Sequence, residues 1–394
     1  MTGKVRVGLV GGGIESFMGG IHLAAIEQSG EAEVVCCALA STRHASFAAG
    51  KQLNFPLRRS YGTYRDMFRR EAVLPEDERM EFVSIIAPNG MHYPISMSAA
   101  DAGFPILCEK PLACSLPEAL NLARKLQKLN IRHGVAFAFG GYPMLLRARK
   151  LLLEEKAIGN IRRVNTTFLL GWMAQRLETA GNKQALWRTD PRRCGPAGCL
   201  MDLGVGCFYL TEWLTGLHVS ELCADLKTNV PGRILDDDCC VMVRFEEGAR
   251  GTFISSQVAA GCQDGMTIEV YGEKGSVRWS QAVPDQLVLR NLSLNEEIYT
   301  GGLSATSHNP QAQQPYGDND AYVAALAETY RSFATYIRNP KQTADGSLAF
   351  ASIEEGLRSL AFIDASIRNV TSLGEGLPQL KWTPFVLPPV PELD

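Results

Sequence analysis

The residues best suited to chemistry in this sequence form the stretch Cys108-Glu109-Lys110-Pro111-Leu112. They follow a short apolar run from Phe104 that is typical of a buried strand. Pro111 cannot donate a hydrogen bond to a strand ladder, so the strand must end before it. Open parallel α/β sheets bind ligands at the carboxyl ends of their strands. The sequence therefore predicts that the Lys110 amine, a group able to give or take a proton, lies at a ligand crevice.

A glycine-rich turn follows the first predicted strand. Residues 4–10 end in an apolar run, Gly11 to Gly20 supply the turn, and residues 22–28 continue as a helix. Strand, glycine turn and helix in this order are the setting of a dinucleotide fingerprint, although Ser16 replaces its third glycine. We expect a dinucleotide to contact a set of turn residues: Gly11, Gly13, Ile14, Ser16 and Phe17. The alternative is a glycine turn that binds no ligand.

The second predicted strand, residues 32–39, runs into Ala40-Ser41-Thr42-Arg43-His44 and has no carboxylate at its end. NAD sites normally place an acidic residue there to bind the ribose hydroxyls. Ser41 and Arg43 suit a 2′-phosphate better, because a guanidinium can give it two charge-assisted hydrogen bonds. We therefore expect NADP to be preferred over NAD. The alternative is that Arg43 is a solvated residue in the first turn of a helix.

Residues 81–87 predict a further strand, which Pro88 and the residues after it end in a turn. Pro88, Asn89 and His92 are therefore candidates for cofactor contacts at the same crevice. His92, like His22, is equally compatible with a packing or capping role. Strands alternating with helices over residues 1–140 predict a doubly wound parallel sheet.

Beyond residue 140 the pattern changes. Six strand-like runs lie between residues 161 and 280, and short turns separate several of them, which predicts a largely antiparallel sheet. We assign residues 141–373 to a second α/β domain, whose late helices pack back near the first domain. Residues 301–320 predict a mobile loop, and residues 374–394 predict an extended, proline-rich tail that could lie across a neighbouring subunit.

Composition argues against several classes of protein. The 394 residues carry a net charge of −3, which gives no electrostatic basis for binding nucleic acid or an anionic membrane. No apolar run approaches the roughly 20 residues of a membrane span, and the early first strand leaves no room for a signal peptide. The eleven cysteines include no Cys-x-x-Cys pair. We expect a cytoplasmic protein with free thiols and no metal.

The chain resembles the glucose–fructose oxidoreductase/inositol dehydrogenase family, the Gfo/Idh/MocA family, in the order and spacing of five motifs. These are the glycine turn, Pro88-Asn89-x-x-His92, Glu109-Lys110-Pro111, Trp187-Arg188-x-Asp190-Pro191 and Gly198-x-x-x-Asp202-x-Gly204. The resemblance implies a Rossmann domain and an α/β domain whose large, mostly antiparallel open sheet makes a homodimer or homotetramer. It also implies NAD(P)-dependent oxidation or reduction of a carbinol/carbonyl pair on a sugar, cyclitol or similar polyol.

The resemblance further implies roles for individual residues. Lys110 would touch both the nicotinamide ribose and the substrate hydroxyl, Glu109 and Asn89 would hold the cofactor, and Asp202 would contact the substrate. An alternative for Asp202 is a helix-start residue favoured by the helix dipole.

Several residues of the second half could bind a ligand or could have only a structural or solvated role. Trp172 and Trp187 could offer an apolar face to a sugar ring or pack in the core, and Tyr142 is a similar case. Lys183 and Arg188 belong to a basic stretch that could bind an anionic group or be solvated. We expect Trp187 and Arg188 near the cofactor, and Tyr142, Trp172 and Lys183 near the substrate.

One position departs from the family pattern. Members often carry a histidine, and some a tyrosine, four residues after the motif aspartate as the partner acid/base, whereas this chain has Gly206. Glycine cannot transfer a proton. Lys110 could act alone, water could fill the space, or Tyr209 could contribute from the following helical turn. Because of Gly206, two other classes of protein remain as alternatives. One is a redox-neutral sugar-modifying enzyme that holds its cofactor tightly, and the other is a non-catalytic dinucleotide sensor.

Overall fold

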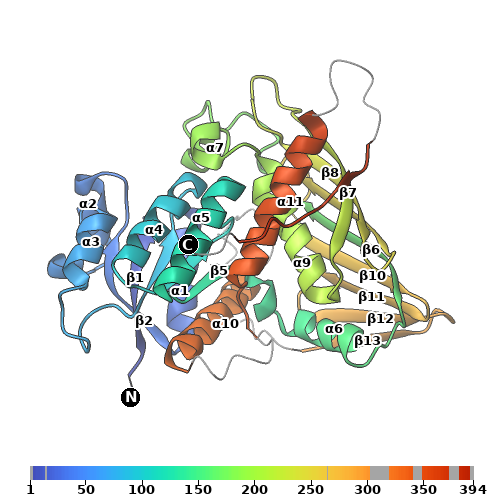
Figure 1. Cartoon of the computed structure of the whole chain (residues 1–394), viewed down its shortest axis with the longest axis horizontal. Coiled ribbons are helices and arrows are strands. Elements are labelled where there is room, and N and C mark those ends of the chain that lie inside the picture. Colours follow the sequence, from blue (N-terminus) through green and yellow to red (C-terminus); the bar gives the residue numbers. More distant parts are fainter. Residues whose placement is uncertain are drawn as a thin grey trace. The chain divides into compact units, whose positions relative to one another are not determined.

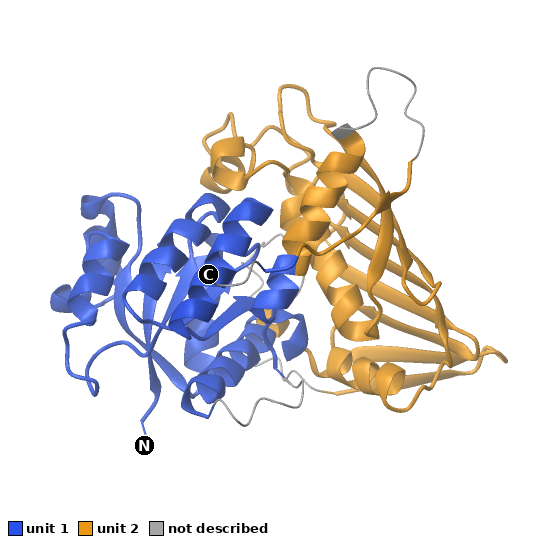
Figure 2. Cartoon of the chain, in the orientation of Figure 1, with its two compact units in different colours: residues 1–141, 323–357, 389–394 blue, residues 142–322, 358–388 orange. Residues whose placement is uncertain are grey.

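The computed structural model describes residues 3–13, 16–263, 265–301, 319–339, 348–371 and 381–390. The chain divides into two compact units (Figure 2). Unit 1 comprises residues 1–141, 323–357 and 389–394, and unit 2 comprises residues 142–322 and 358–388. Each unit has its own sheet, so each can be described by itself.

Unit 1 contains a five-stranded parallel sheet in the order β2-β1-β3-β4-β5. Its strands are β1 (Val5–Gly11), β2 (Ala32–Ala38), β3 (Phe82–Ile86), β4 (Ile106–Glu109) and β5 (His133–Ala136). Every residue of β3, β4 and β5 is buried, as expected for a parallel sheet covered on both faces. The carboxyl ends of parallel strands meet at one edge, and the strand order reverses beside β1, where such sheets bind ligands. The predicted doubly wound fold is confirmed.

Most helices of unit 1 begin at a side-chain cap. They are α1 (Phe17–Ser29), α2 (Arg43–Gln52), α3 (Tyr64–Glu71), α4 (His92–Asp101) and α5 (Leu116–Leu129). Hydroxyls of Ser16, Thr42, Thr63 and Ser115 accept hydrogen bonds from the free N–H groups in the first turns of α1, α2, α3 and α5. Local sequence therefore fixes where these helices start.

A helix from the carboxyl-terminal part of the chain completes this core. Residues from 323 onward of α10 (Asn319–Arg338) belong to unit 1. Phe333 of α10 meets Phe82 of β3 edge to face, with ring centroids 5.0 Å apart. Phe350 packs on Phe333 with a similar geometry at 5.1 Å. Aromatic burial of this size binds the late helix firmly to the sheet.

Unit 2 contains a nine-stranded sheet in the order β13-β12-β11-β10-β6-β9-β8-β7-β14. Its strands are β6 (Ile161–Leu169), β7 (Val219–Lys227), β8 (Asp238–Phe245), β9 (Arg250–Ser256), β10 (Gly265–Gly272), β11 (Gly275–Ser280), β12 (Gln286–Asn291), β13 (Glu296–Thr300) and β14 (Thr383–Pro384). Only β6 and β9 pair in parallel. The predicted large and mostly antiparallel sheet is confirmed, and β12, β13 and β14 are additions to the predicted strands.

The helices of unit 2 are α6 (Pro143–Leu153), α7 (Lys183–Arg188), α8 (Pro191–Cys194), α9 (Val205–Thr215) and residues 358–371 of α11 (Ile353–Thr371). Figure 1 shows α6, α9 and α11 on one side of the sheet. Phe208 of α9 stacks on Phe362 of α11 at 4.6 Å and meets Phe253 of β9 edge to face at 6.5 Å. Within the described ranges no helix covers the opposite face, so the sheet is open.

Two predicted segments fall largely outside the described residues. The predicted loop over residues 301–320 is described only at its ends, and the proline-rich tail only over residues 381–390, which include β14. None of the described helices is long and apolar enough to cross a membrane.

His133, the first residue of β5, is a buried polar residue with an unusual setting. It is 7% exposed, and within the described part of the chain neither ring nitrogen has a hydrogen-bond partner. Burial lowers the pKa of His133 from 6.5 to about 3. Between these two pH values the unfolded chain therefore binds a proton that the folded chain does not. The contribution of His133 to the free energy of unfolding is therefore fully present above pH 6.5 and is lost as the pH falls toward 3.

We predict that His133→Leu flattens the acid sensitivity of folding. Between pH 7 and pH 5 the native protein should lose about 2 kcal/mol more unfolding free energy than the variant. Urea denaturation at the two pH values measures this difference. An equal loss in both proteins would contradict the prediction.

Candidate functional site

The turn between β1 and α1 requires glycine. Gly11 and Gly12 have φ angles of 84° and 73°, which residues with a side chain rarely adopt. A Cβ atom on Gly13 would lie 2.8 Å from the carbonyl oxygen of Leu39, just after β2. The turn leads into the amino end of α1, where backbone N–H groups and the helix dipole favour an anion. These residues fit the pyrophosphate of a dinucleotide.

Ser16 and Gly19 together take the place of the third glycine of the fingerprint. Ser16 caps α1, its Oγ accepting a hydrogen bond from the Gly19 N–H at 3.3 Å. A Cβ atom on Gly19 would lie 2.0 Å from the carbonyl oxygen of Gly12, so Gly19 provides the close packing of helix against turn. The sequence signal for this role was the pair Gly19-Gly20, which ends the glycine-rich stretch before the helix predicted over residues 22–28. Phe17 is the first residue of α1, and Ile14 lies outside the described residues.

Ser41 and Arg43 lie just beyond β2. Arg43 is the first residue of α2, and its side chain is 68% exposed. Its Nη2 lies 3.0 Å from Asp66 Oδ2. No carboxylate occurs in residues 38–42. The end of β2 therefore presents hydroxyls and an accessible guanidinium.

The turn after β3 holds a buried histidine. His92 is 1% exposed, and its Nδ1 and Nε2 each lie 2.7 Å from a carbonyl oxygen, those of Pro111 and Ala87. Burial lowers the pKa of His92, so the neutral ring has one proton to donate to one of the two carbonyls. His92 thus links the ends of β3 and β4. Asn89 is also buried, at 5% exposed. The cofactor contacts predicted for this motif stay predictions.

Lys110 directly follows β4, at the carboxyl edge of the sheet. Its main-chain N–H donates to Glu109 Oε2 at 3.2 Å, and Glu109 Oε1 lies 3.0 Å from His22 Nε2. The register places Cys108 opposite Ile85, and Ile86 opposite Gly11. Lys110 and the glycine turn therefore share one edge of the sheet of unit 1.

In unit 2, Asp202 lies in a π-helical turn, Leu200–Gly204, that leads into α9. Asp202 is 5% exposed, and its Oδ2 accepts hydrogen bonds from Arg188 Nε at 3.0 Å and Gln257 Nε2 at 2.9 Å. A buried carboxylate is stable only with such partners. Single π-helical turns occur frequently at functional sites. Gln257 had not been predicted, because it lies 55 residues away and carries no local signal.

Two tryptophans surround the Arg188 guanidinium. Its carbon lies 4.2 Å from the ring centre of Trp187 and 5.5 Å from that of Trp172, within cation–π range. Trp172 Nε1 is buried and, as far as the described residues go, has no hydrogen-bond partner. We call Trp172, Trp187, Arg188, Asp202 and Gln257 the Asp202 cluster. Lys183, at the exposed start of α7, is not among the contacts of Asp202 described above.

The motif glycines pack the turn that carries Asp202. Asp236 accepts hydrogen bonds from the Gly198 N–H at 2.6 Å and the Leu200 N–H at 2.8 Å. A Cβ atom on Gly198 would lie 2.3 Å from the Asp236 carbonyl oxygen. One on Gly204 would lie 3.2 Å from Ser255 Oγ. Gly198 therefore allows a close approach to the backbone just before β8, and Gly204 allows a close approach to a side chain of β9.

Three other candidate positions are deeply buried. Gly206 and Tyr209 lie in α9, and Tyr209 is 2% exposed. Tyr142 is fully buried, its hydroxyl accepts a hydrogen bond from Gln281 Nε2 at 3.2 Å, and its ring meets Trp279 edge to face. The catalytic role of Tyr209 and the substrate contact of Tyr142 stay predictions.

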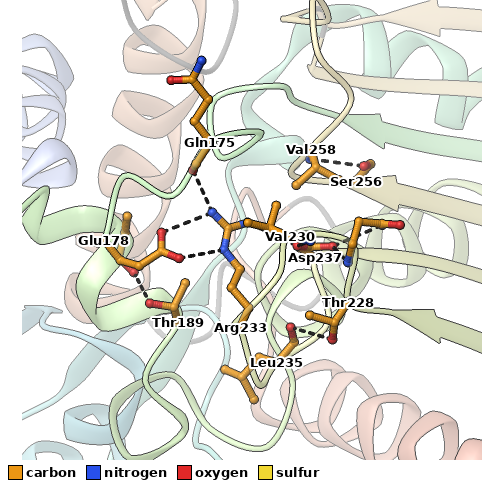
Figure 3. Close-up of polar contacts among 12 residues, drawn as sticks. Gln175, Glu178, Thr189, Thr228, Val230, Arg233, Leu235, Asp237, Ser256 and Val258 are labelled. Carbon is orange, nitrogen blue, oxygen red and sulfur yellow. Dashed lines mark hydrogen bonds and ion pairs between the residues drawn. The ribbon is translucent and has the colours of Figure 1, made fainter. Parts of the chain in front are cut away.

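A buried arginine, Arg233, joins several segments of unit 2 (Figure 3). The Arg233 side chain is 1% exposed and donates to both carboxylate oxygens of Glu178, at 3.0 and 3.2 Å. It also donates to Asp237 Oδ2 at 3.2 Å and to the Gln175 carbonyl at 2.9 Å. Burial acts to raise the pKa of Glu178, but the bonds from Arg233 hold it below its ordinary value. The Asp237 carbonyl in turn accepts the main-chain N–H of Gln257, at 2.9 Å.

Two family models match the chain. Residues 5–137 match the oxidoreductase family with an NAD-binding Rossmann fold, and residues 146–278 match the GFO/IDH/MocA C-terminal domain. The chain belongs to the Gfo/Idh/MocA family. It is an NAD-binding oxidoreductase, and the resemblance seen in its motifs is confirmed.

Relatives of this family member match over nearly its whole length. The uncharacterized oxidoreductase YfiI of Bacillus subtilis is 29% identical over 93% of this chain and 94% of its own. The levoglucosan dehydrogenase of Pseudarthrobacter phenanthrenivorans is 28% identical over 92% of this chain and 95% of its own. An inositol dehydrogenase homolog of Azotobacter vinelandii, solved with NAD⁺, superposes with a TM-score of 0.86 at 26% identity, covering 98% of each chain.

We predict that Arg233→Met destabilises this Gfo/Idh/MocA protein by about 3–5 kcal/mol, because it leaves the buried carboxylate of Asp237 and the half-buried carboxylate of Glu178 short of a partner. Urea denaturation measures the loss. Arg192→Met is the matched control, since the Arg192 side chain is 89% exposed and pairs with Asp190 at the surface. The control should unfold at the native midpoint. A native midpoint for Arg233→Met would refute this expectation.

Proposed function

We propose that this chain is a dehydrogenase that transfers hydride between a nicotinamide dinucleotide and a carbinol or carbonyl of a sugar, cyclitol or similar polyol. The observation that carries this proposal is the place of Lys110, at the same sheet edge as the glycine turn. The names of two relatives support the substrate class, since levoglucosan and inositol are both ring polyols. The cofactor, when bound, would accept or supply the hydride.

The chain's own residues would bind the reactants and move a proton. The glycine turn and the amino end of α1 would hold the pyrophosphate. The Lys110 amine would take the hydroxyl proton when a carbinol is oxidised, and return it when a carbonyl is reduced. Asp202, fixed by Arg188 and Gln257, would accept hydrogen bonds from substrate hydroxyls, and Trp172 Nε1 would donate one.

A second candidate function rests on Gly206. This buried position in α9 offers no acid/base group where family members often have histidine. A redox-neutral enzyme, which oxidises a sugar carbon transiently and then reduces it again, would suit that change. It would show little net nicotinamide turnover and a tightly held cofactor. Product analysis of the sugar after incubation distinguishes it from a simple dehydrogenase.

We also propose a homodimer or homotetramer formed through the open face of the nine-stranded sheet. Ile254 of β9 and Tyr271 of β10 are each 38% exposed, and the alternation of their strands places them on that face. Sedimentation equilibrium distinguishes a dimer from a tetramer.

We predict that Lys110→Met lowers kcat/KM by about 10²- to 10⁴-fold, the usual contribution of general acid–base catalysis. Nicotinamide absorbance with a panel of sugars and cyclitols measures turnover, and fluorescence titration measures dinucleotide binding. Lys128→Met, an exposed lysine of α5, is the control and should behave as the native protein. Full activity in Lys110→Met would refute the proposed role.

We predict a preference for NADP⁺ that depends on Arg43. Arg43→Ala should raise KM for NADP⁺ about 10- to 100-fold through lost bonds to the 2′-phosphate, and leave KM for NAD⁺ unchanged. Arg69→Ala is a close control, because Arg69 is 76% exposed and pairs with the same carboxylate, Asp66, at 3.0 Å. Equal effects of Arg43→Ala on both cofactors would contradict the preference.

A further inference from the structure

A line of buried hydrogen bonds ends at the main chain of Lys110. Ser84 Oγ lies 2.7 Å from Tyr330 Oη, and Tyr330 Oη lies 2.6 Å from His22 Nδ1. His22 Nε2 lies 3.0 Å from Glu109 Oε1, and Glu109 Oε2 accepts the Lys110 N–H at 3.2 Å. The four residues are at most 7% exposed. We call Ser84, Tyr330, His22 and Glu109 the buried line.

The buried line joins elements from both ends of the chain within unit 1. His22 lies in α1, the helix that begins at the glycine turn, and Tyr330 lies in α10, 308 residues later. Ser84 belongs to β3, and Glu109 ends β4. The helix predicted to hold the pyrophosphate is therefore hydrogen-bonded to the strand that presents the lysine.

The hydrogen atoms along the line can be assigned from donor and acceptor chemistry. The Glu109 carboxylate only accepts, so the proton of a neutral His22 ring lies on Nε2 and Nδ1 accepts. Burial raises the pKa of Tyr330, so its phenol keeps a proton to donate to His22 Nδ1. Ser84 then donates to Tyr330 Oη. Every bond runs in the same direction, toward Glu109, which favours mutual polarisation.

We propose that His22 and Tyr330 are positioning residues for Lys110. They hold the Glu109 carboxylate, which holds the Lys110 main chain, so the amine meets its substrate in one geometry. This inference rests on the proposed function of Lys110. Loss of the hydrogen bonds of the buried line would displace the Lys110 amine, which acts in the proposed reaction, and would leave the glycine turn intact. Misplacement of a reacting group by about 1 Å costs about 10²-fold in rate.

The test compares four variants with the native protein. His22→Leu removes both ring nitrogens, and His22→Gln keeps an N–H donor near the position of Nε2. Tyr330→Phe removes one hydroxyl and keeps the packed ring. Tyr61→Phe is the matched control, because the Tyr61 hydroxyl donates to another buried carboxylate of unit 1, Glu71, at 2.7 Å.

We expect kcat to fall about 10- to 100-fold in His22→Leu and about 2- to 10-fold in Tyr330→Phe. His22→Gln should recover part of the loss. Tyr61→Phe should lower the melting temperature and leave kcat unchanged. A purely structural role of His22 would lower stability in both histidine variants and leave the ratio of kcat to the native value near one.

Amide hydrogen exchange provides a readout that needs no substrate. Exchange at the Lys110 N–H should be about tenfold faster in His22→Leu than in the native protein, and native-like in Tyr61→Phe. Unchanged exchange at Lys110, or equal acceleration in the control, would overturn the positioning role. A native protein that turns over no substrate would contradict the proposed function, and the exchange result would still decide the role of the buried line.

Discussion

A buried carboxylate is stable only when hydrogen-bond donors replace the water that it has lost. This constraint shapes both units of the chain. Glu109 has His22 and the Lys110 main chain, and Asp202 has Arg188 and Gln257. Each carboxylate thereby fixes the residues around it. The positions for which we propose a chemical role are held from several elements at once, which limits the cost of ordering them when ligands bind.

The fold could be predicted where its signals are local. Strand, glycine turn and helix are adjacent in the sequence, so the start of unit 1 followed from Gly11 and its neighbours. Six of the nine strands of the second sheet were also predicted from their apolar runs. β13 was not, because all its residues but Tyr299 are exposed and it carries Glu296 and Glu297 in place of an apolar alternation. The pairing of β14 with β7 is a contact between distant segments and has no local pattern.

The site could be predicted in part. Motif spacing placed Lys110 and Asp202 among the candidates, and their chemical roles stay predictions. Two contacts near them carry no local signal, because Gln257 lies 55 residues from Asp202 and Tyr330 lies 308 residues from His22. Asp202 was predicted near the start of a helix, but the kind of helix was not. The turn at Leu200–Gly204 is π-helical, with hydrogen bonds from residue i to i+5 in place of i+4. Sequence alone does not show such a turn.

The two outer strands of the nine-stranded sheet have a consequence for solubility. A sheet edge carries unpaired N–H and C=O groups that can recruit a strand from another molecule. At one edge β14 ends the sheet with Pro384, which has no N–H to offer. At the other edge β13 carries Glu297 and the ion pair of Glu296 with Arg290 of β12, so charged side chains protect that edge. A wide, open sheet can thus exist without acting as a template for aggregation.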